Sequence, residues 1–556
     1  MISSKSECSR NGEPLPGSMI AENRLNRFFS ALLPVLFFVL LFVWWLTPER
    51  ELFRVEGLYA ASAREYRPGI NVTAHSVVQR NVLPLYPAVT SLLHNCGIPM
   101  ESALRMVSVF MLGAWAVLAA FIAGKRRNFR AGVVCFCCCA GTVIAMDKGV
   151  DGTPAAMTAF FLFASQMAFF HYGSRLANWN KAWIFGALLL ILAFFSGGPV
   201  VILFFALPIL FLRRPLSVGS KFNTPGFFTG CFMVAAAVIS WGISVGMSVN
   251  AEIISVEFSL WDYLKQVLTF PLVSIVRMMP WSLLCWLPFC AALQPLDQTP
   301  VFSRYLRTLF FSNFMLLWLL PKRPGSELFL ICGPLAVLTG LYYEYGIRRY
   351  WKWFRKALFA GEIFLFLLVI SIAALSFMPD AWLNTIPFIS AERWLFRRMP
   401  GVNLLAAGAL TGVFLLTVFF HIMRKRAPVW SLILMLSTGC MLFFNLIMFP
   451  NYCCETQWRK LGREISGAVA DEPVKELYKL DIEGMYCGLF YAGLPVKKIR
   501  SASELPPDET VYLVSVGFPR HFSGWRWSPL TQNLENFSIW KGVPIPPDDE
   551  PPAGEW

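Results

Sequence analysis

The chain has 556 residues, of which 56% are hydrophobic, 15% are aromatic and only 15% are charged, and its formal net charge is +14. A soluble protein of this length carries about 25% charged residues, so the composition excludes that class and indicates a polytopic membrane protein. The positive charge does not require a nucleic-acid partner, because the Lys and Arg residues lie mainly between apolar runs, where membrane topology accounts for them.

Apolar runs follow one another up to about residue 449. A hydrocarbon core of ~30 Å needs roughly 20 apolar residues per helix, so runs bounded by charge, Pro or Gly predict transmembrane helices. The first run ends in a Trp pair and lacks a small-residue cleavage site, so we expect it to remain as an anchor. Around 196–198 a hairpin of two half-length helices is an alternative to two full spans. We predict about 13 spans, at 27–47, 103–123, 131–146, 154–172, 182–196, 198–213, 226–248, 280–294, 306–320, 328–343, 358–378, 402–423 and 428–449.

Basic loops orient this bundle. Residues 124–130, 213–221, 346–356 and 423–428 are rich in Lys and Arg. Since short cytoplasmic loops carry the excess of positive charge, these loops and the N-terminal segment 1–26 are predicted to be cytoplasmic. The transmembrane domain 27–449 then has exported loops at 48–102 and 249–279.

The C-terminal part is more polar than the rest. Residues 450–541 contain the strand-like stretch ETVYLVSVGF (509–518), which predicts a small exported α/β domain of roughly 100 residues. Residues 542–556 are Pro-rich and acidic and predict an extended or disordered tail. No GxGxxG or P-loop pattern supports a nucleotide-sugar donor. The predicted fold class is therefore an α-helical polytopic membrane protein with a small exported C-terminal α/β domain.

Glu56 follows the first apolar run, in FRVEGLYAASAREY (53–66). Helical spacing predicts an interfacial helix with Glu56 at the margin of its apolar stripe, at the membrane surface. A partly desolvated carboxylate there is expected to have a raised pKa, close to the working range of a base. The stripe consists of Leu52, Val55, Tyr59, Ala63 and Tyr66.

Five segments occur in a characteristic order. They are VEGLYAASAREY (55–66), NVLPLYPAVTSLL (81–93), DKGVDGTPAAMTAFFLF (147–163), MMPWSLLCWLPF (278–289) and PKRPGSELFLICGPLAVLTG (321–340). Together they resemble the GT-C type membrane glycosyltransferases, in the bacterial branch of aminoarabinose transferases and protein O-mannosyltransferase relatives. The resemblance implies sugar transfer from a polyprenyl-phosphate-linked donor to an envelope lipid, glycan or protein acceptor, at the exported face of the bacterial inner membrane.

The same resemblance implies site residues. The family's first loop opens with Asp-Glu, two variable residues and Tyr-Ala, which Glu56, Tyr59 and Ala60 match, whereas Val55 replaces the Asp. Asp151 matches the acid of the second loop. Glu56 and Asp151 are thus the expected catalytic carboxylates, which would deprotonate or orient the acceptor in one shared pocket. Tyr59 and Tyr86 are expected substrate contacts.

Both acids also have structural interpretations. Glu56 would serve only to hold its loop if it paired with Arg54, Arg64 or Arg80, and Asp151 would act as a helix N-cap. Cations on the exported side are expected to hold the lipid phosphate, although each has the alternative of an interfacial position with its charge in the headgroups. These cations are Arg80, Arg277, Lys322 and Arg323.

No cofactor is required by this interpretation, and a divalent metal shared by Glu56 and Asp151 stays open. The expected partners are a polyprenyl-phosphate sugar lipid, an envelope acceptor and the membrane, with no nucleic acid.

Two other classes of function compete with the glycosyltransferase. A non-catalytic scaffold derived from the enzyme family is kept open by Val55. A lipid or solute transporter would need ionisable residues inside the spans, which we expect to be nearly free of charge.

Overall fold

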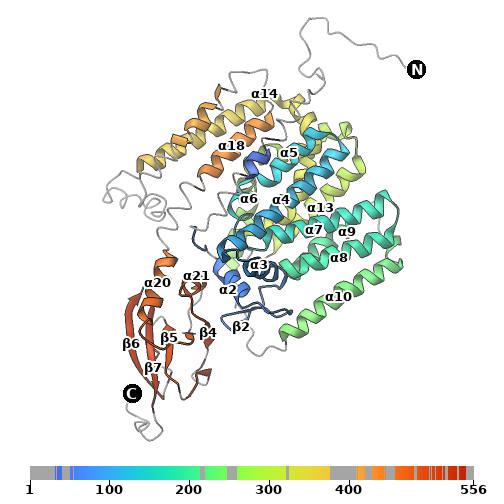
Figure 1. The fold of residues 1–556 in the computed structure, drawn as a ribbon. Helices are drawn as coiled ribbons and strands as arrows, with labels where there is room; N and C mark the ends of the chain where they lie inside the picture. The colour runs from blue at the N-terminus through green and yellow to red at the C-terminus, as the bar shows by residue number, and fades with distance from the viewer. Residues whose placement is uncertain are drawn as a thin grey trace, which may run out of the picture.

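The structure is a computed structural model that describes residues 50–53, 55–212, 219–246, 260–320, 325–375 and most of 457–545, with parts of 32–39, 408–419 and 429–445. A bundle of helices forms its larger part, and a small sheet domain lies at one end, beside α2 and α3 (Figure 1). The segment 1–26, most of the first predicted span, Lys322, Arg323 and residues 546–556 lie outside the described residues.

The helical part follows the apolar runs of the sequence. In chain order its elements are α2 (Glu56–Arg64), α3 (Leu85–Asn95), α4 (Met100–Arg126), α5 (Phe129–Ala140), α6 (Val143–Asp147), α7 (Ala155–Phe170), the π-helical turn η1 (His171–Arg175), α8 (Trp179–Gly197), α9 (Val200–Leu210), η2 (Gly219–Lys221), α10 (Pro225–Gly246), α11 (Leu260–Arg277), α12 (Ser282–Cys285), η3 (Leu287–Phe289), η4 (Ala291–Leu296), α13 (Pro300–Leu319), η5 (Gly325–Leu328), α14 (Phe329–Leu375) and α18 (Val429–Phe443).

Local signals set the ends of these helices. The side chains of Asn128 and Asn178 cap α5 and α8 by accepting a backbone N–H of the first turn, at 2.9 and 3.1 Å. Pro300 occupies the start of α13, where its missing N–H costs no hydrogen bond. Gly198, with φ of 88°, separates α8 from α9 in a conformation that favours glycine. The chain around 196–198 therefore joins a 19-residue helix to an 11-residue helix.

Within the described part of the chain, three helices are long and apolar enough to cross a membrane, namely α4, α8 and α10. A fourth span is obtained if residues 263–277 and 282–289 form one broken span. The chain bends by 109° between these two segments. The predicted spans 328–343 and 358–378 fall mostly on α14. This element consists of two helices that meet at a kink at Tyr350, where the backbone is not helical. The predicted number of about 13 spans stays a prediction.

Residues 249–294 differ from the expectation of a loop followed by a span. The predicted loop 249–279 contains α11, whereas 280–294 forms only the short turns α12, η3 and η4. Pro280, Pro288 and Pro295 lack a backbone N–H and clash with a preceding helical turn, so they prevent one continuous helix here. The carbonyl of Met279, at the bend, accepts a hydrogen bond from Val143 N at 2.8 Å.

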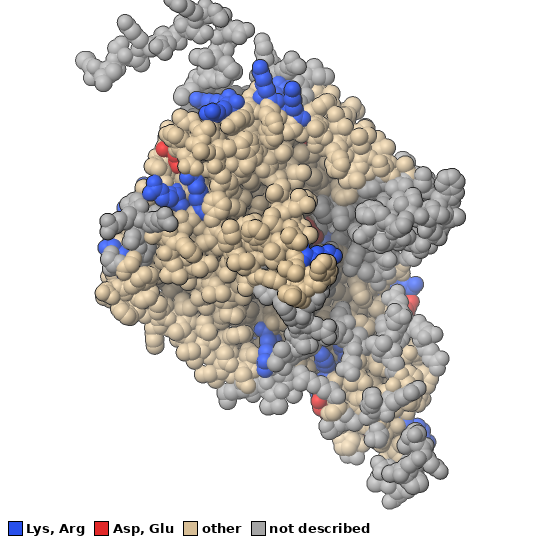
Figure 2. All heavy atoms as spheres, turned by 180° about the vertical axis from the view of Figure 1, so that it is seen from behind, with Lys and Arg blue, Asp and Glu red and all other residues tan. Residues whose placement is uncertain are grey.

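Two of the basic loops lie together at one end of the bundle. Arg127, just after α4, donates to Glu344 on α14 at 3.2 Å, and Asn128 donates to the same carboxylate at 2.7 Å. The loop 124–130 therefore lies beside the part of α14 that precedes the basic residues 346–356, and the cytoplasmic placement of these basic residues stays a prediction. Figure 2 shows one face of the bundle as a wide uncharged area with Lys and Arg at its upper and left margins and a few below it.

The C-terminal domain is a mixed five-stranded sheet with two helices, α20 (Trp458–Ala468) and α21 (Tyr486–Tyr491). The predicted strand 509–518 is β5 (Val511–Ser515), which is fully buried because it pairs on both edges. The sheet reaches Pro544, beyond the predicted boundary at 541, since Lys541 and Gly542 pair with both neighbouring strands. Its order is β4 (Val496–Ile499), β3 (Leu477–Leu480), β5, β7 (Phe537–Pro544) and β6 (Trp525–Leu534), with β3 parallel to β4 and β5.

This domain is docked onto the first loop. Leu52 N donates to the hydroxyl of Tyr491 at 2.8 Å, and Arg64 lies 3.9 Å over the ring of Phe490. Gly57 makes the close approach of α2 and α21 feasible, because a Cβ there would lie 2.5 Å from the backbone nitrogen of Cys487. The domain and the loop thus form one packed unit.

His75 belongs to the same contact. It lies between β1 (Thr73–Ala74) and β2 (Val77–Val78), and its ring stacks on Tyr486 at 4.8 Å. Burial lowers the pKa of His75 to about 3, and the nearby charges of Lys479, Arg64 and Lys498 act in the same direction. The imidazole is therefore neutral in the docked state at ordinary pH.

We expect the docking to weaken as the pH falls. An unfolded or undocked His75 takes up a proton near pH 6.5, whereas the docked ring does not until about pH 3. Below 6.5 this group alone removes ~1.4 kcal/mol of docking free energy per pH unit. Hydrogen exchange at residues 486–491, compared at pH 7 and pH 5, measures it. His75→Phe keeps the stacking and should remove this increment, and an unaltered pH dependence in that variant would contradict the assignment.

Candidate active site

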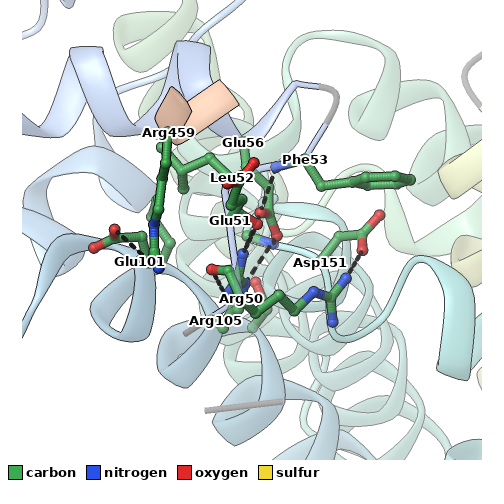
Figure 3. Close-up of polar contacts among 12 residues, drawn as sticks. Arg50, Glu51, Leu52, Phe53, Glu56, Glu101, Arg105, Asp151 and Arg459 are labelled. Atoms are coloured by element: carbon green, nitrogen blue, oxygen red, sulfur yellow. Dashed lines mark hydrogen bonds and ion pairs between the residues drawn. The ribbon is translucent and has the colours of Figure 1, made fainter. Parts of the chain in front are cut away.

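Glu56 is the first residue of α2, and its side chain points into the protein (Figure 3). One carboxylate oxygen accepts from Phe53 N at 2.9 Å and from Arg105 Nη2 at 2.8 Å. The other accepts from Gly152 N at 2.7 Å and from Arg105 Nε at 3.3 Å. Four donors thus hold this carboxylate, two of them from one guanidinium group.

The structure corrects two expectations for Glu56. Glu56 is 0% exposed, whereas Val55 is 54% exposed, so Glu56 is buried inside the protein and is not on the margin of an exposed stripe. Burial by itself would raise the pKa of Glu56, but the charges of Arg105 and Arg50 and the Gly152 N–H outweigh it, and the pKa is lowered. The expected raised pKa is therefore wrong for this residue, because charge-assisted hydrogen bonds stabilise the ionised form.

Arg105 is the partner that the sequence interpretation missed. It lies on α4, is fully buried, and also donates to the backbone carbonyls of Arg50 at 2.9 Å and Glu51 at 2.6 Å. The alternative pairing of Glu56 with Arg64 or Arg80 is therefore replaced by a pair with Arg105, and Arg54, the third partner considered, lies outside the described residues. A signal was present, since Arg105 stands inside the predicted span 103–123, and an ionisable residue there marks a polar network.

Asp151 lies in the loop between α6 and α7 and is 4% exposed. Its carboxylate oxygens are 3.3 Å from Lys148 Nζ and 3.8 Å from Arg50 Nη2, which are long contacts. Burial raises the pKa of Asp151 to about 6, opposed by Lys148 and Arg50 and reinforced by Glu56. The expected raised pKa thus holds for this acid. No side chain caps α7, whose first turn is preceded by Pro154, so the N-cap alternative is not observed.

The two acids come from different loops and meet at Gly152. The N–H of Gly152 donates to Glu56, and Asp151 is the preceding residue. A Cβ on Gly152 would lie 2.9 Å from Leu104 Cβ and 3.4 Å from the Glu56 carboxylate, so glycine allows this approach. The two loops therefore converge, with Arg50 beside Asp151 (Figure 3) and Lys148 in contact with the same carboxylate, whereas the shared pocket stays a prediction.

The two tyrosines form packing contacts behind the acids. The hydroxyl oxygen of Tyr86 lies 2.8 Å from Leu104 O and 3.0 Å from the Ser108 hydroxyl, and the Ser108 hydroxyl lies 2.9 Å from Thr153 O, so the two hydroxyl hydrogens serve two of these three contacts at a time. The Tyr59 ring meets Tyr86 edge-on at 5.5 Å. These contacts connect α2 and α3 to the Asp151 loop, and the substrate contacts expected of both residues stay predictions.

The predicted phosphate-binding cations are less directly connected. Arg80 follows β2, and its Nε is buried without a hydrogen-bond partner among the described residues. Arg277 ends α11, two residues before the carbonyl that accepts from Val143 at the start of α6. No contact of Arg80 or Arg277 with Glu56 or Asp151 occurs in the described ranges. Lys322 and Arg323 fall outside them.

The arrangement of the helical bundle and the C-terminal sheet domain also occurs in solved structures of other proteins. Two crystal structures of the aminoarabinose transferase ArnT from Cupriavidus metallidurans share the fold, one in the apo state and one bound to undecaprenyl phosphate. Each matches with a TM-score of 0.67 and 14% sequence identity, over 91% of this chain and 97% of ArnT. No family model and no curated protein matches the sequence.

The archaeal oligosaccharyltransferase AglB from Archaeoglobus fulgidus gives a weaker likeness, with a TM-score of 0.44 and 11% identity over 86% of this chain. The predicted resemblance to the GT-C glycosyltransferases is confirmed for the fold through ArnT. The chain therefore has the fold of a membrane glycosyltransferase.

Proposed function

We propose that this protein transfers a sugar from a polyprenyl-phosphate-linked donor to an envelope lipid, glycan or protein at the exported face of the bacterial inner membrane. One observation carries the proposal. Asp151, an acid with its pKa raised to about 6, lies beside Arg50 and Lys148 where two loops meet in an ArnT-like fold.

Asp151 is the proposed general base. An acceptor hydroxyl attacks the anomeric carbon of the sugar, its proton passes to the Asp151 carboxylate, and the bond between the sugar and the phosphate breaks. The polyprenyl phosphate leaves with the bonding electrons, and cations stabilise its charge. A base with a pKa near 6 is largely ionised at neutral pH and is still able to accept a proton.

Glu56 has a different proposed role. Because its oxygens already accept four hydrogen bonds, it positions the Gly152 N–H and the Arg105 guanidinium rather than taking a proton. It fixes the loop that carries Asp151. This assignment separates the two acids, which the resemblance alone treats as equivalent.

A divalent metal between the two acids does not fit the residues present. Arg105 already occupies the Glu56 carboxylate, and Arg50 and Lys148 face Asp151, so an added cation would meet three positive side chains. We therefore propose that the positive charge for the leaving phosphate comes from Arg and Lys. The complex of ArnT with undecaprenyl phosphate supports a ligand of this chemistry.

A substitution of Arg80 tests the proposed phosphate-binding site. We expect Arg80→Ala to weaken binding of undecaprenyl phosphate to the purified full chain about tenfold, the scale of a lost charge-assisted hydrogen bond. Arg67→Ala, an exposed cation in the same loop, is the control and should change affinity less than about twofold. Fluorescence titration in detergent measures both. Equal affinity in wild type and Arg80→Ala removes Arg80 from the site, and a wild type that does not bind the lipid contradicts the proposed donor.

A non-catalytic scaffold is the second candidate, and one observation favours it. Val55 stands where the resemblance places an Asp, and it is exposed, whereas the neighbouring Glu56 is buried. A scaffold of this kind would bind the lipid phosphate but leave envelope glycolipids and glycoproteins unchanged.

A further inference from the structure

A second feature of the bundle lies away from the acids. Helices α9 and α13 lie side by side (Figure 1) and enclose a groove of about 680 Å³, within the ~300–1,000 Å³ range of small-molecule sites. Its walls are apolar, with Leu207 of α9 and Phe211, just after α9, on one side and Phe311 and Met315 of α13 on the other. The groove is strongly polar at one end, where Arg304 and Arg307 line it.

The arginine end of the groove is positively charged. Arg307 contacts the hydroxyl of Tyr342, which itself donates to Asp297 at 2.8 Å, while the Nε of Arg307 is buried without a hydrogen-bond partner among the described residues. A further cation is close, since the guanidinium of Arg126 lies 3.6 Å from the ring centre of Phe302, on the first turn of α13. Neither Arg307 nor Arg126 has an ion pair with another described residue.

The length of α4 gives the distance between the arginine end of the groove and the Glu56 site. Arg105 and Arg126 stand at opposite ends of that helix, and at 1.5 Å per residue they are ~30 Å apart, the thickness of a hydrocarbon core. The arginine end therefore lies about one hydrocarbon thickness from the Glu56 site, at the other end of α4. From Arg304 to Met315 the groove follows α13 for ~16 Å, which matches the depth of one leaflet.

We propose that this groove holds an anionic phospholipid of the leaflet opposite the Glu56 site, with its phosphate on Arg304 and Arg307 and an acyl chain between α9 and α13. Arg forms bidentate hydrogen bonds to phosphate, and basic pockets between membrane helices select anionic head groups. The inference does not rest on the proposed sugar transfer, because the site is at the other end of the bundle.

The full chain, purified in detergent, is titrated with phosphatidylglycerol, phosphatidylcholine and undecaprenyl phosphate, and native mass spectrometry counts the bound lipid. Wild type should retain phosphatidylglycerol about tenfold better than phosphatidylcholine. Arg304→Glu should remove this preference. Met315→Trp, which fills the apolar part, should reduce retention of phosphatidylglycerol while the arginines stay in place.

Arg348→Glu is the matched control, because it reverses an exposed charge on α14 outside the groove lining. It should leave the preference for phosphatidylglycerol unchanged. If Arg304→Glu and Arg348→Glu lose this preference equally, the preference comes from the general charge of the surface, and the proposal is overturned. It is equally overturned if Arg304→Glu and Met315→Trp reduce retention of undecaprenyl phosphate instead, since the groove would then belong to the polyprenyl lipid.

Discussion

Asp151→Asn is expected to reduce sugar transfer by about a hundredfold or more while the protein stays folded. The amide keeps the size of the side chain but cannot accept the acceptor's proton, and its lack of charge relieves rather than adds a burial cost. Mass spectrometry of envelope glycolipids and glycoproteins, from cells that produce wild type or variant, measures the effect. Lipid extraction from the same cells gives the identity of the modified molecule.

The pH profile separates a base from a structural acid. Because the pKa of Asp151 is raised to about 6, transfer by wild type should fall as the pH is lowered through that value. Stability should change in the opposite sense through this group, since a carboxyl with a raised folded pKa favours the folded state as it takes up its proton. Asp151→Asn should lose both dependences.

Asp147→Asn is the control for this experiment. Asp147 lies 3.5 Å from the same Lys148 Nζ but has a more exposed side chain. If the two variants retain equal transfer, Asp151 is not the base. If envelope molecules are the same with wild type, either variant or no protein, the scaffold interpretation replaces the enzymatic one.

Arg105→Met is expected to destabilise the protein by about 3–5 kcal/mol, the range for breaking a buried ion pair. The change leaves the Glu56 charge buried with only backbone donors and leaves the carbonyls of Arg50 and Glu51 without their partner. Thermal unfolding of the purified protein in detergent measures it. Because α2 and the Asp151 loop are both held by this pair, lipid-phosphate binding should be lost as well.

Arg459→Met is the matched comparison. Arg459 pairs with Glu101, near the start of the same helix α4, at 3.4 Å, but both side chains are partly exposed. Its loss should cost no more than about 1 kcal/mol. A similar fall in unfolding temperature for the two variants would mean that the buried pair of Arg105 and Glu56 contributes no more to stability than the partly exposed pair of Arg459 and Glu101. The double variant Arg105→Met with Glu56→Met should recover part of the loss, since it removes the uncompensated charge.

The sequence predicted the parts of the fold that depend on local composition. Long apolar runs predicted α4, α7, α8 and α10, and the alternating segment 509–518 predicted β5. The bend between α11 and α12 was missed because hydropathy averages over residues, whereas the single Pro280 interrupts the helix.

The site was predicted less completely, for a different reason. The resemblance placed Glu56 and Asp151 in one neighbourhood, but the stripe argument considered only the residues of one helix. The burial of Glu56 is compensated by Arg105, 49 residues later, and by Gly152, 96 residues later. Partners so distant in the chain are invisible to helical periodicity. The orientation of Glu56 and the sign of its pKa shift therefore required the tertiary structure.

The hydrogen bond from Leu52 N to the Tyr491 hydroxyl joins residues 439 apart. During synthesis at ~5–20 residues per second, the ribosome needs roughly 20–90 s to travel that distance. The turn that carries Glu56 thus waits for a further 439 residues of synthesis before its outer partner exists. This corner of the molecule therefore matures only after α21 has been made, and a nascent chain released before that point would lack it.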